Sequence, residues 1–265
     1  MAIANNTGCP VPELPSPSTV LPVLYQDEHL VLIHKPAGWL VHRTGLDAGE
    51  TRFVVQTLRD QLGQRVYPVH RLDKGTSGVL LMALTSEVAR LLVQALERHE
   101  MRKSYLAMVR GWPLDQFEVD HALRPDDAPE EAPAQSAQTR FECVATLSLP
   151  VSVDRYPSTR VALVRAEPLT GRRHQIRRHL KHVSHPIIGD ATHGKGAHNR
   201  WWAEYLGLQR LWLHAQSLTL THPITGQLMQ VQSDFSQPFN QDWQALLTED
   251  WTIRVDGPGL GQTTR

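Results

Sequence analysis

The sequence predicts an α+β fold. Short apolar runs typical of strands and amphipathic segments typical of helices follow one another along the 265 residues, without the regular alternation of a doubly wound sheet. The composition, 41% hydrophobic and 20% charged, is that of an ordinary globular protein. We therefore expect one folded domain over residues 20–252. We expect a proline-rich disordered arm at 1–19 and a flexible tail at 253–265 on either side of it.

The first half of the chain contains clear strand and helix patterns. Val54, Leu58 and Leu62 have helical spacing, and Ser86 is a suitable N-cap for a second amphipathic segment. The run 79–82 is apolar throughout and has the length of a buried strand. The predicted elements are strands at 23–25, 30–33 and 79–82, a helix at 52–62 and a helix that begins near Ser86.

The second half is dominated by strands around one basic helix. Ile176, Leu180 and Val183 form the apolar face of a helix expected from Arg172 to about Val183. The other predicted elements are strands at 105–109, 139–147, 159–166, 211–220 and 228–231, a short helix at 241–247, an acidic surface segment at 113–136 and a loop rich in glycine and histidine at 189–200.

The chain lacks the sequence features of membrane and secreted proteins. No apolar run approaches the roughly 18 residues that cross a bilayer, and the N-terminal residues do not form a signal peptide. Cys9 and Cys143 are too few for a disulfide framework. We therefore expect a cytoplasmic protein without a membrane partner.

Charge is segregated along the chain although the net formal charge is zero. Between Arg160 and Pro186 there are six arginines and one lysine against a single acid, Glu167, whereas residues 115–131 carry seven acids against Arg124. Seven cations in such a short segment repel one another unless an anion lies nearby, and RNA phosphate is a suitable one. The alternative is a solvated basic helix face without a ligand.

The stretch His70-Arg71-Leu72-Asp73-Lys74-Gly75-Thr76-Ser77-Gly78 is the strongest candidate for a reactive site. Its two glycines predict a tight loop that leads into the apolar strand, and loops of this kind display functional side chains. Asp73 would be the displayed acid. The alternative interpretation is a surface ion pair of little energetic value.

Three other chemistries fit the sequence poorly. Four histidines lie between His174 and His185, but the His-Glu-x-x-His spacing of a zinc helix is absent, so we expect no metal site. A kinase catalytic loop would place its aspartate directly after the arginine. A hydrolase nucleophile at Ser77 would need a Gly-x-Ser-x-Gly turn, which the sequence lacks there.

Several motifs, taken together and in this order, resemble the RluA family of RNA pseudouridine synthases. They are His70-Arg71-Leu72-Asp73 with Thr76-Ser77-Gly78, then Tyr105, then Thr170-Gly171-Arg172 with His174-Gln175-Ile176-Arg177 and His179, and finally His185-Pro186-Ile187-Ile188-Gly189-Asp190. The resemblance covers about residues 22–235. It implies a mixed, mainly antiparallel sheet with a central active-site cleft, flanked by helices and loops.

The resemblance also implies an activity, the isomerisation of uridine to pseudouridine in RNA without a cofactor. Asp73 would be the catalytic carboxylate, paired with Arg177, and Tyr105 would stack on the base and could remove its C5 proton. Arg71 would fill the space left by the flipped base, and Ile176 would form an apolar wall. The RNA-binding residues expected on this basis are Arg71, Arg172, Arg173, His174, Ile176 and Lys181.

The RNA substrate is the least defined part of this expectation. The segments 38–43 and 207–211 resemble members of the family that act on tRNA, which implies uridine 65 in the T stem as the target. We expect the enzyme to be a monomer. A ribosomal RNA synthase of the same family and a non-catalytic RNA-binding module remain as alternatives.

Overall fold

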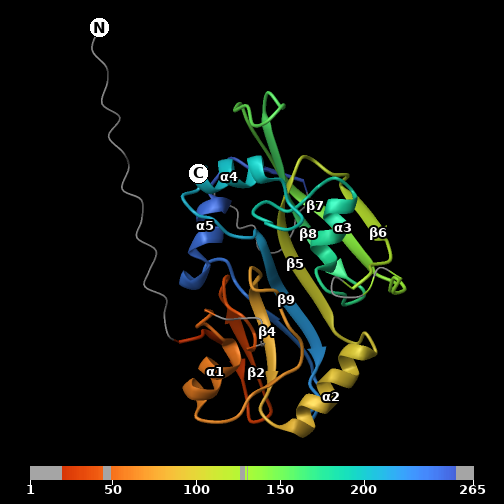
Figure 1. The fold of residues 1–265 in the computed structure, drawn as a ribbon. Coiled ribbons are helices and arrows are strands. Elements are labelled where there is room, and N and C mark those ends of the chain that lie inside the picture. Colours follow the sequence, from red (N-terminus) through yellow and green to blue (C-terminus); the bar gives the residue numbers. More distant parts are fainter. Residues whose placement is uncertain (1–19, 44–48, 126–128, 130, 255–265) are drawn as a thin grey trace, which may run out of the picture.

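The structure is a computed structural model that describes residues 20–43, 49–125, 129 and 131–254 (Figure 1). The expected arm at 1–19 lies outside these residues, as does the expected tail beyond Arg254. No helix within the described part of the chain has both the length and the apolar character needed to cross a membrane.

Eleven strands of the described residues form one sheet, with five α-helices around it. The strands are β1 (Val23–Gln26), β2 (Leu30–Lys35), β3 (Tyr67–Pro68), β4 (Ser77–Ala83), β5 (Arg102–Arg110), β6 (Gln116–Asp120), β7 (Gln138–Leu149), β8 (Thr159–Pro168), β9 (Leu213–Thr221), β10 (Leu228–Gln232) and β11 (Thr252–Ile253). The helices are α1 (Val54–Leu62), α2 (Ser86–Glu97), α3 (Gln175–His182), α4 (Gly196–Tyr205) and α5 (Gln241–Leu247), with a 3-10 turn at Pro238–Asn240.

The sheet has two halves that meet between β4 and β9. Its main strand order is β1-β2-β4-β9-β5-β8-β7-β11, with β3, β6 and β10 paired to β4, β7 and β9. Every pairing among the described strands is antiparallel except the short parallel contact of β4 with β9, at Ser77–His214 and Gly78–Ala215. A Cβ at Gly78 would collide with the Ala215 backbone, so the close approach requires glycine. The loop that carries Asp73 leads directly into this junction.

Strands β2 and β4 are buried throughout because both faces of their part of the sheet are covered. Alternate side chains point to opposite faces, so Ile33 and Leu80 pack with α1, whereas Leu32 and Leu81 pack with α2. The other half of the sheet has its own core with α3, α4 and α5, and Figure 1 shows these helices away from α1 and α2. Tyr105 on β5 contacts the cores of both halves.

The structure confirms the predicted α+β class and most of the predicted elements, but it corrects five details. The cap of α2 is Thr85, whose hydroxyl accepts from Val88 N, and not Ser86. The basic helix begins at Gln175 and not at Arg172, because His174 adopts a left-handed conformation with φ 54° that interrupts the helix. Strand β6 lies within the expected acidic surface segment, and α4 begins within the expected loop at 189–200. Residue 253, expected in the tail, pairs with β7 as part of β11.

Candidate active site

The loop 70–76, here called the Asp73 loop, is fixed by backbone hydrogen bonds and by a buried lysine. Thr76 N donates to Asp73 O at 3.1 Å, and Gly38 N donates to Lys74 O at 2.8 Å. The Lys35 side chain lies beneath the loop with its Nζ 3.2 Å from Lys74 O and 3.0 Å from Pro36 O. Burial lowers the pKa of Lys35 to about 7, while the negative charge of Asp73 acts in the opposite direction. These hydrogen bonds therefore fix the backbone of the Asp73 loop against the protein core.

Asp73 forms an ion pair with Arg177 of α3. Arg177 Nη1 donates to Asp73 Oδ2 at 3.0 Å, and the two side chains are 9% (Arg177) and 25% (Asp73) exposed. His174 Nε2 lies 3.8 Å from the same oxygen. Burial acts to lower the pKa of Arg177, but its bonds to Asp190 and Asp73 outweigh burial and raise it. Arg177 is therefore a permanent cation directed at a partly open carboxylate.

Asp190 holds the other edge of the Arg177 guanidinium. Arg177 Nε and Nη2 donate to the two Asp190 carboxylate oxygens at 2.7 and 2.8 Å. The backbone N–H groups of Thr192 and His193 donate to the same carboxylate. Burial acts to raise the pKa of Asp190, but these hydrogen bonds outweigh it and lower the pKa. This buried acid therefore stays ionised and fixes the direction of Arg177.

Asn199 of α4 braces the turn that carries Asp190. Its Oδ1 accepts from Gly189 N at 2.8 Å, and its Nδ2 donates to Asp190 O at 2.9 Å. A continuous set of polar contacts thus runs from Asn199 through Asp190 and Arg177 to Asp73. The sequence motif around Gly189 and Asp190 carries no role in the prediction, and Asn199 is not among the predicted site residues because its segment was predicted as a loop.

The turn before α3 is pinned by the side chain of Gln175. Its Oε1 accepts from Thr170 Oγ1 at 2.7 Å and from Arg172 N at 2.9 Å, and its Nε2 donates to Gln138 O and to Thr139 Oγ1. Arg172 and Arg173 therefore lie on a fixed turn and not on the helix. The helix expected from Arg172 therefore excludes Arg172 and Arg173, which precede α3.

Tyr105 lies on β5 between two alanines, Ala166 of β8 and Ala215 of β9, which leave room for its ring. Burial raises the pKa of Tyr105, and the negative charge of Asp73 adds to this effect. The phenol is therefore protonated at neutral pH in the free protein. In that form it can stack on a base or donate a hydrogen bond.

These elements enclose a cavity of about 600 Å³. Its lining contains eight of the nine predicted site residues: Arg71, Asp73, Tyr105, Arg172, Arg173, His174, Ile176 and Arg177. Lys181 does not line the cavity and is exposed on α3. Five arginine and lysine side chains line the cavity against two acids, Asp73 and Glu97, so it is suited to a polyanion.

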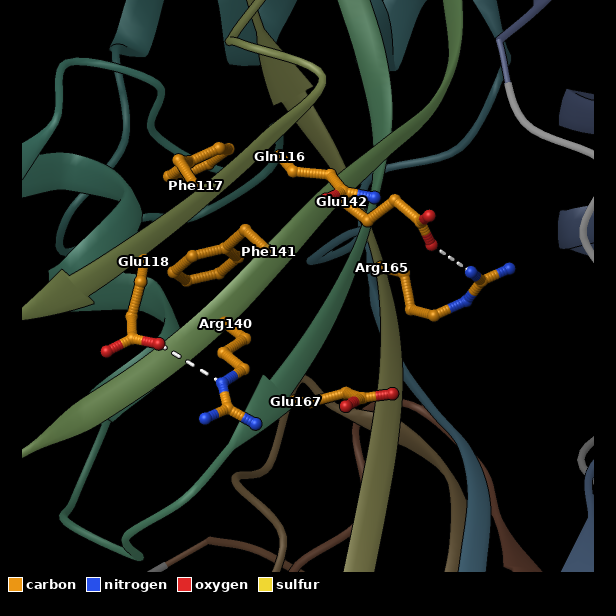
Figure 2. A pocket seen from close by; sticks show the side chains of 8 residues that line it. All are labelled: Gln116, Phe117, Glu118, Arg140, Phe141, Glu142, Arg165 and Glu167. Carbon is orange, nitrogen blue, oxygen red and sulfur yellow. Dashed lines mark hydrogen bonds and ion pairs between the residues drawn. The ribbon is translucent and has the colours of Figure 1, made fainter.

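A second hollow lies over β6, β7 and β8 and has a different character. Both of its arginines are paired with acids, Arg140 with Glu118 at 3.1 Å and Arg165 with Glu142, as Figure 2 shows. These acids satisfy the arginines, so this surface offers a phosphate little net positive charge. Among the described residues, no three histidine, cysteine, aspartate or glutamate side chains gather as ligands for a metal ion.

Comparison with known proteins shows the family. The sequence model of the family described as RNA pseudouridylate synthase matches residues 29–182. The chain is 46% identical over 237 residues to tRNA pseudouridine synthase C of Yersinia pestis, covering 87% of this chain and 91% of the relative. It is 48% identical over 239 residues to tRNA pseudouridine synthase C of Pectobacterium carotovorum subsp. carotovorum, where the match covers 87% of this chain but only 62% of the relative's length.

Solved structures show the same fold at lower sequence identity. Human RNA Pseudouridylate Synthase Domain Containing 1 superposes with a TM-score of 0.67 at 22% identity, over 91% of this chain and 92% of that one. Human RNA Pseudouridylate Synthase Domain Containing 4 gives a TM-score of 0.64 at 24% identity, over 88% and 95%. The chain belongs to the RNA pseudouridylate synthase family, a family of isomerases. The predicted pseudouridine synthase fold is confirmed.

Proposed function

We propose that this protein converts uridine to pseudouridine in tRNA and that Asp73 is its catalytic carboxylate. The observation that carries the proposal is the 3.0 Å pair between Asp73 and Arg177 inside a cavity lined by cations. A carboxylate facing RNA phosphates would weaken binding, so a module that only bound RNA would gain nothing from Asp73. The names of the bacterial relatives support tRNA as the substrate.

The reaction rearranges bonds without a net gain or loss of atoms or electrons. The N1–C1′ bond of uridine breaks, the freed base rotates, a C5–C1′ bond forms, and the proton on C5 is removed while N1 acquires one. No redox cofactor is needed for this balance. Asp73 serves either as the nucleophile at C1′ or as a base at C2′ that gives a glycal, and both routes require an ionised carboxylate. Arg177 favours that form and directs it.

The other cavity residues take supporting roles in this proposal. The target base must leave its stack to reach Asp73, at a cost of roughly a few kcal/mol. Arg71 would occupy the vacated space, since a guanidinium is flat enough to stack between bases. Tyr105 would stack on the flipped base beside Ile176, and it would take part in removing the C5 proton. Such a role requires its phenol to pass its own proton on, because burial keeps the free enzyme's phenol protonated.

The remaining cations would hold the RNA backbone. Arg172 and Arg173 lie on the turn that Gln175 pins, and His174 lies next to Asp73. Lys181, outside the cavity, would contact phosphates farther from the target nucleotide. Contacts of this kind predict affinity that falls steeply with salt concentration.

We propose uridine 65 in the T stem as the target, on the basis of the likeness to relatives named tRNA pseudouridine synthase C. We further propose that the enzyme acts as a monomer in the cytoplasm. Asp73, Tyr105, Arg177 and Asp190 all come from one chain, so the site needs no partner subunit. Light scattering of the purified protein with and without tRNA tests the monomer.

A tritium-release assay tests the activity and its substrate. The protein is incubated with 5-³H-uridine-labelled unmodified tRNA and, separately, with labelled unmodified ribosomal RNA. We expect release from tRNA, mapping to uridine 65, and none after Asp73→Asn, although that variant should still bind tRNA. Release from ribosomal RNA alone would overturn the substrate. Substantial release by Asp73→Asn would overturn Asp73 as the catalyst, and salt-sensitive binding without release by the wild type would favour the binding module.

A further inference from the structure

Lys103 lies in the same cavity as the catalytic candidates, but the function proposed above gives it no role. It is on β5 two residues before Tyr105, so the two side chains point to the same face of the sheet. Both line the cavity. Arg102, the neighbouring cation, is exposed and points to the opposite face.

Among the residues that the structure describes, the buried cations have acceptors, whereas the half-buried Lys103 has none. Arg177 is held by two carboxylates, Lys35 by two carbonyls, and Arg210 by Asp242 and Ser77. Within the described part of the chain, no carboxylate lies within ion-pair distance of Lys103 and no hydrogen bond joins its ammonium to an acceptor. Burial is the one cause of its lowered pKa, with no acid acting against it. Burial removes part of the water around this ammonium and no protein acceptor replaces that water, so the ammonium is available to an anionic ligand in the cavity.

The residues around Lys103 provide no negatively charged group for its ammonium, but they leave space for a ligand. His70 beside it is kept neutral, because burial, together with the Lys103 charge, lowers the pKa of His70 to about 3. Residue 171 is a glycine, and a Cβ at that position would lie 4.0 Å from the Lys103 ammonium. The absence of a side chain there keeps the approach between Lys103 and the 170–174 turn open. The ammonium thus faces a space bordered by Arg172 and Arg173, which are also cationic.

The missing partner is therefore a permanent anion. An oxygen of the detached uracil carries negative charge only during the reaction, so it would leave Lys103 uncompensated in the bound substrate. A backbone phosphate is charged throughout. We propose that Lys103 binds the phosphate of a nucleotide adjacent to the target uridine. This inference rests on the proposed function.

Binding and turnover of an unmodified tRNA transcript test the proposal in Lys103→Met, Lys103→Arg and the matched control Arg102→Met. Affinity is measured across a series of KCl concentrations, and turnover by tritium release at saturating RNA. We expect Lys103→Met to weaken binding about tenfold and to lower the slope of log affinity against log salt by about one. Turnover at saturating RNA should fall by a smaller factor than affinity, because the phosphate contact is made in the bound substrate and in the transition state alike. Lys103→Arg should restore most of the affinity, and Arg102→Met should match the wild type.

A second measurement identifies the phosphate. Single neutral methylphosphonates are placed at each linkage that flanks the target uridine in a short RNA hairpin. At one linkage, the losses of binding free energy caused by the methylphosphonate and by Lys103→Met should not be additive, because both changes remove the same contact. Additive losses at every linkage, an unchanged salt slope, or a fall in turnover with unchanged affinity would each overturn the proposal.

Two controls separate this inference from its alternatives. Lys103→Met removes an unpaired buried charge, so its melting temperature should equal or exceed that of the wild type. A large fall in melting temperature would make Lys103 a structural residue and would overturn the proposal. Tritium release by the wild type reports on the isomerase itself, so a failure of the proposed function is visible independently of Lys103.

Discussion

Arg177 donates two parallel hydrogen bonds, of 2.7 and 2.8 Å, from Nε and Nη2 to Asp190, and its Nη1 donates to Asp73. A planar guanidinium held at two of its nitrogens cannot rotate away from its remaining partner. Asp190 is only 1% exposed, so its charge acts on Arg177 without screening by water. Asp190 therefore orients Arg177, and Arg177 in turn orients Asp73.

Asp190→Asn should separate orientation from RNA binding. The amide cannot accept both guanidinium bonds or neutralise Arg177, so we expect Arg177 to shift and turnover to fall about 100-fold, as for a catalytic group misplaced by ~1 Å. Breaking the buried pair should also lower the free energy of unfolding by about 3 kcal/mol. Single-turnover kinetics and urea unfolding measure the two effects, and tRNA affinity should stay near the wild-type value.

The matched control is Glu118→Gln, which removes the acid of the exposed Arg140–Glu118 pair shown in Figure 2. An exposed ion pair contributes little, so this variant should match the wild type in unfolding and in turnover. Equal behaviour of the two variants would contradict the role assigned to Asp190.

Asn199→Ala should have a smaller effect of the same kind. It removes the two hydrogen bonds that brace Gly189 and the carbonyl of Asp190. We expect turnover to fall about tenfold and the free energy of unfolding to fall by about 1–3 kcal/mol, the cost of leaving buried backbone groups unpaired. Because Asn199 acts through Asp190, its effect on turnover should largely vanish in the Asp190→Asn background. Additive losses in the double variant would exclude this relay.

Tyr105→Phe should leave base stacking intact and slow the last step. Phenylalanine presents a similar ring, so tRNA affinity should remain within about twofold. The variant lacks the hydroxyl that would take part in proton removal, so we expect tritium release to slow about 100-fold, within the usual range for a lost general base. Rapid quenching would then show cleavage of the N1–C1′ bond ahead of tritium release. Wild-type release rates would limit Tyr105 to stacking.

Lys35 should give the stability of the protein a specific pH dependence. Its pKa is about 7 in the folded protein because of burial, against an ordinary value of 10.5 in the unfolded chain. Between these values the unfolded state binds more protons, so the free energy of unfolding rises with pH. The part of the free energy of unfolding that depends on neutral Lys35 is therefore fully present above pH 10.5 and is lost as the pH falls towards 7.

The comparison with Lys35→Met isolates this effect, because methionine does not titrate. From pH 7 to pH 9 the wild type should gain stability relative to the variant, on the order of 1 kcal/mol per pH unit. Guanidinium unfolding at pH 6, 7, 8 and 9 measures the difference. Parallel stability curves for the two proteins would contradict the buried, weakly basic state of Lys35.

The elements that the sequence predicted well are those whose own packing is visible in their pattern. Residues 79–82 of strand β4 form a continuous apolar run because the strand is covered on both faces, and α1 has its buried residues at helical spacing. Helix α4 was missed because its sequence gives no such pattern. It begins at a glycine, and its buried side chains are His198 and Trp202, too few to mark a face. The backbone of His174, which shortens the basic helix, is likewise set by the contacts of Gln175 with β7.

The fold class, the family resemblance and the candidate residues Asp73, Tyr105 and Arg177 could be predicted from local motifs of distinctive residue types. Which of these groups come into contact depends on the tertiary structure. Asp73 and Arg177 are 104 residues apart in the chain, and Asn199, Lys35 and Lys103 gain their significance from neighbours that no local pattern identifies. Local spacing specifies helices and strands, whereas contacts between distant segments depend on how the two halves of the sheet meet at β4 and β9.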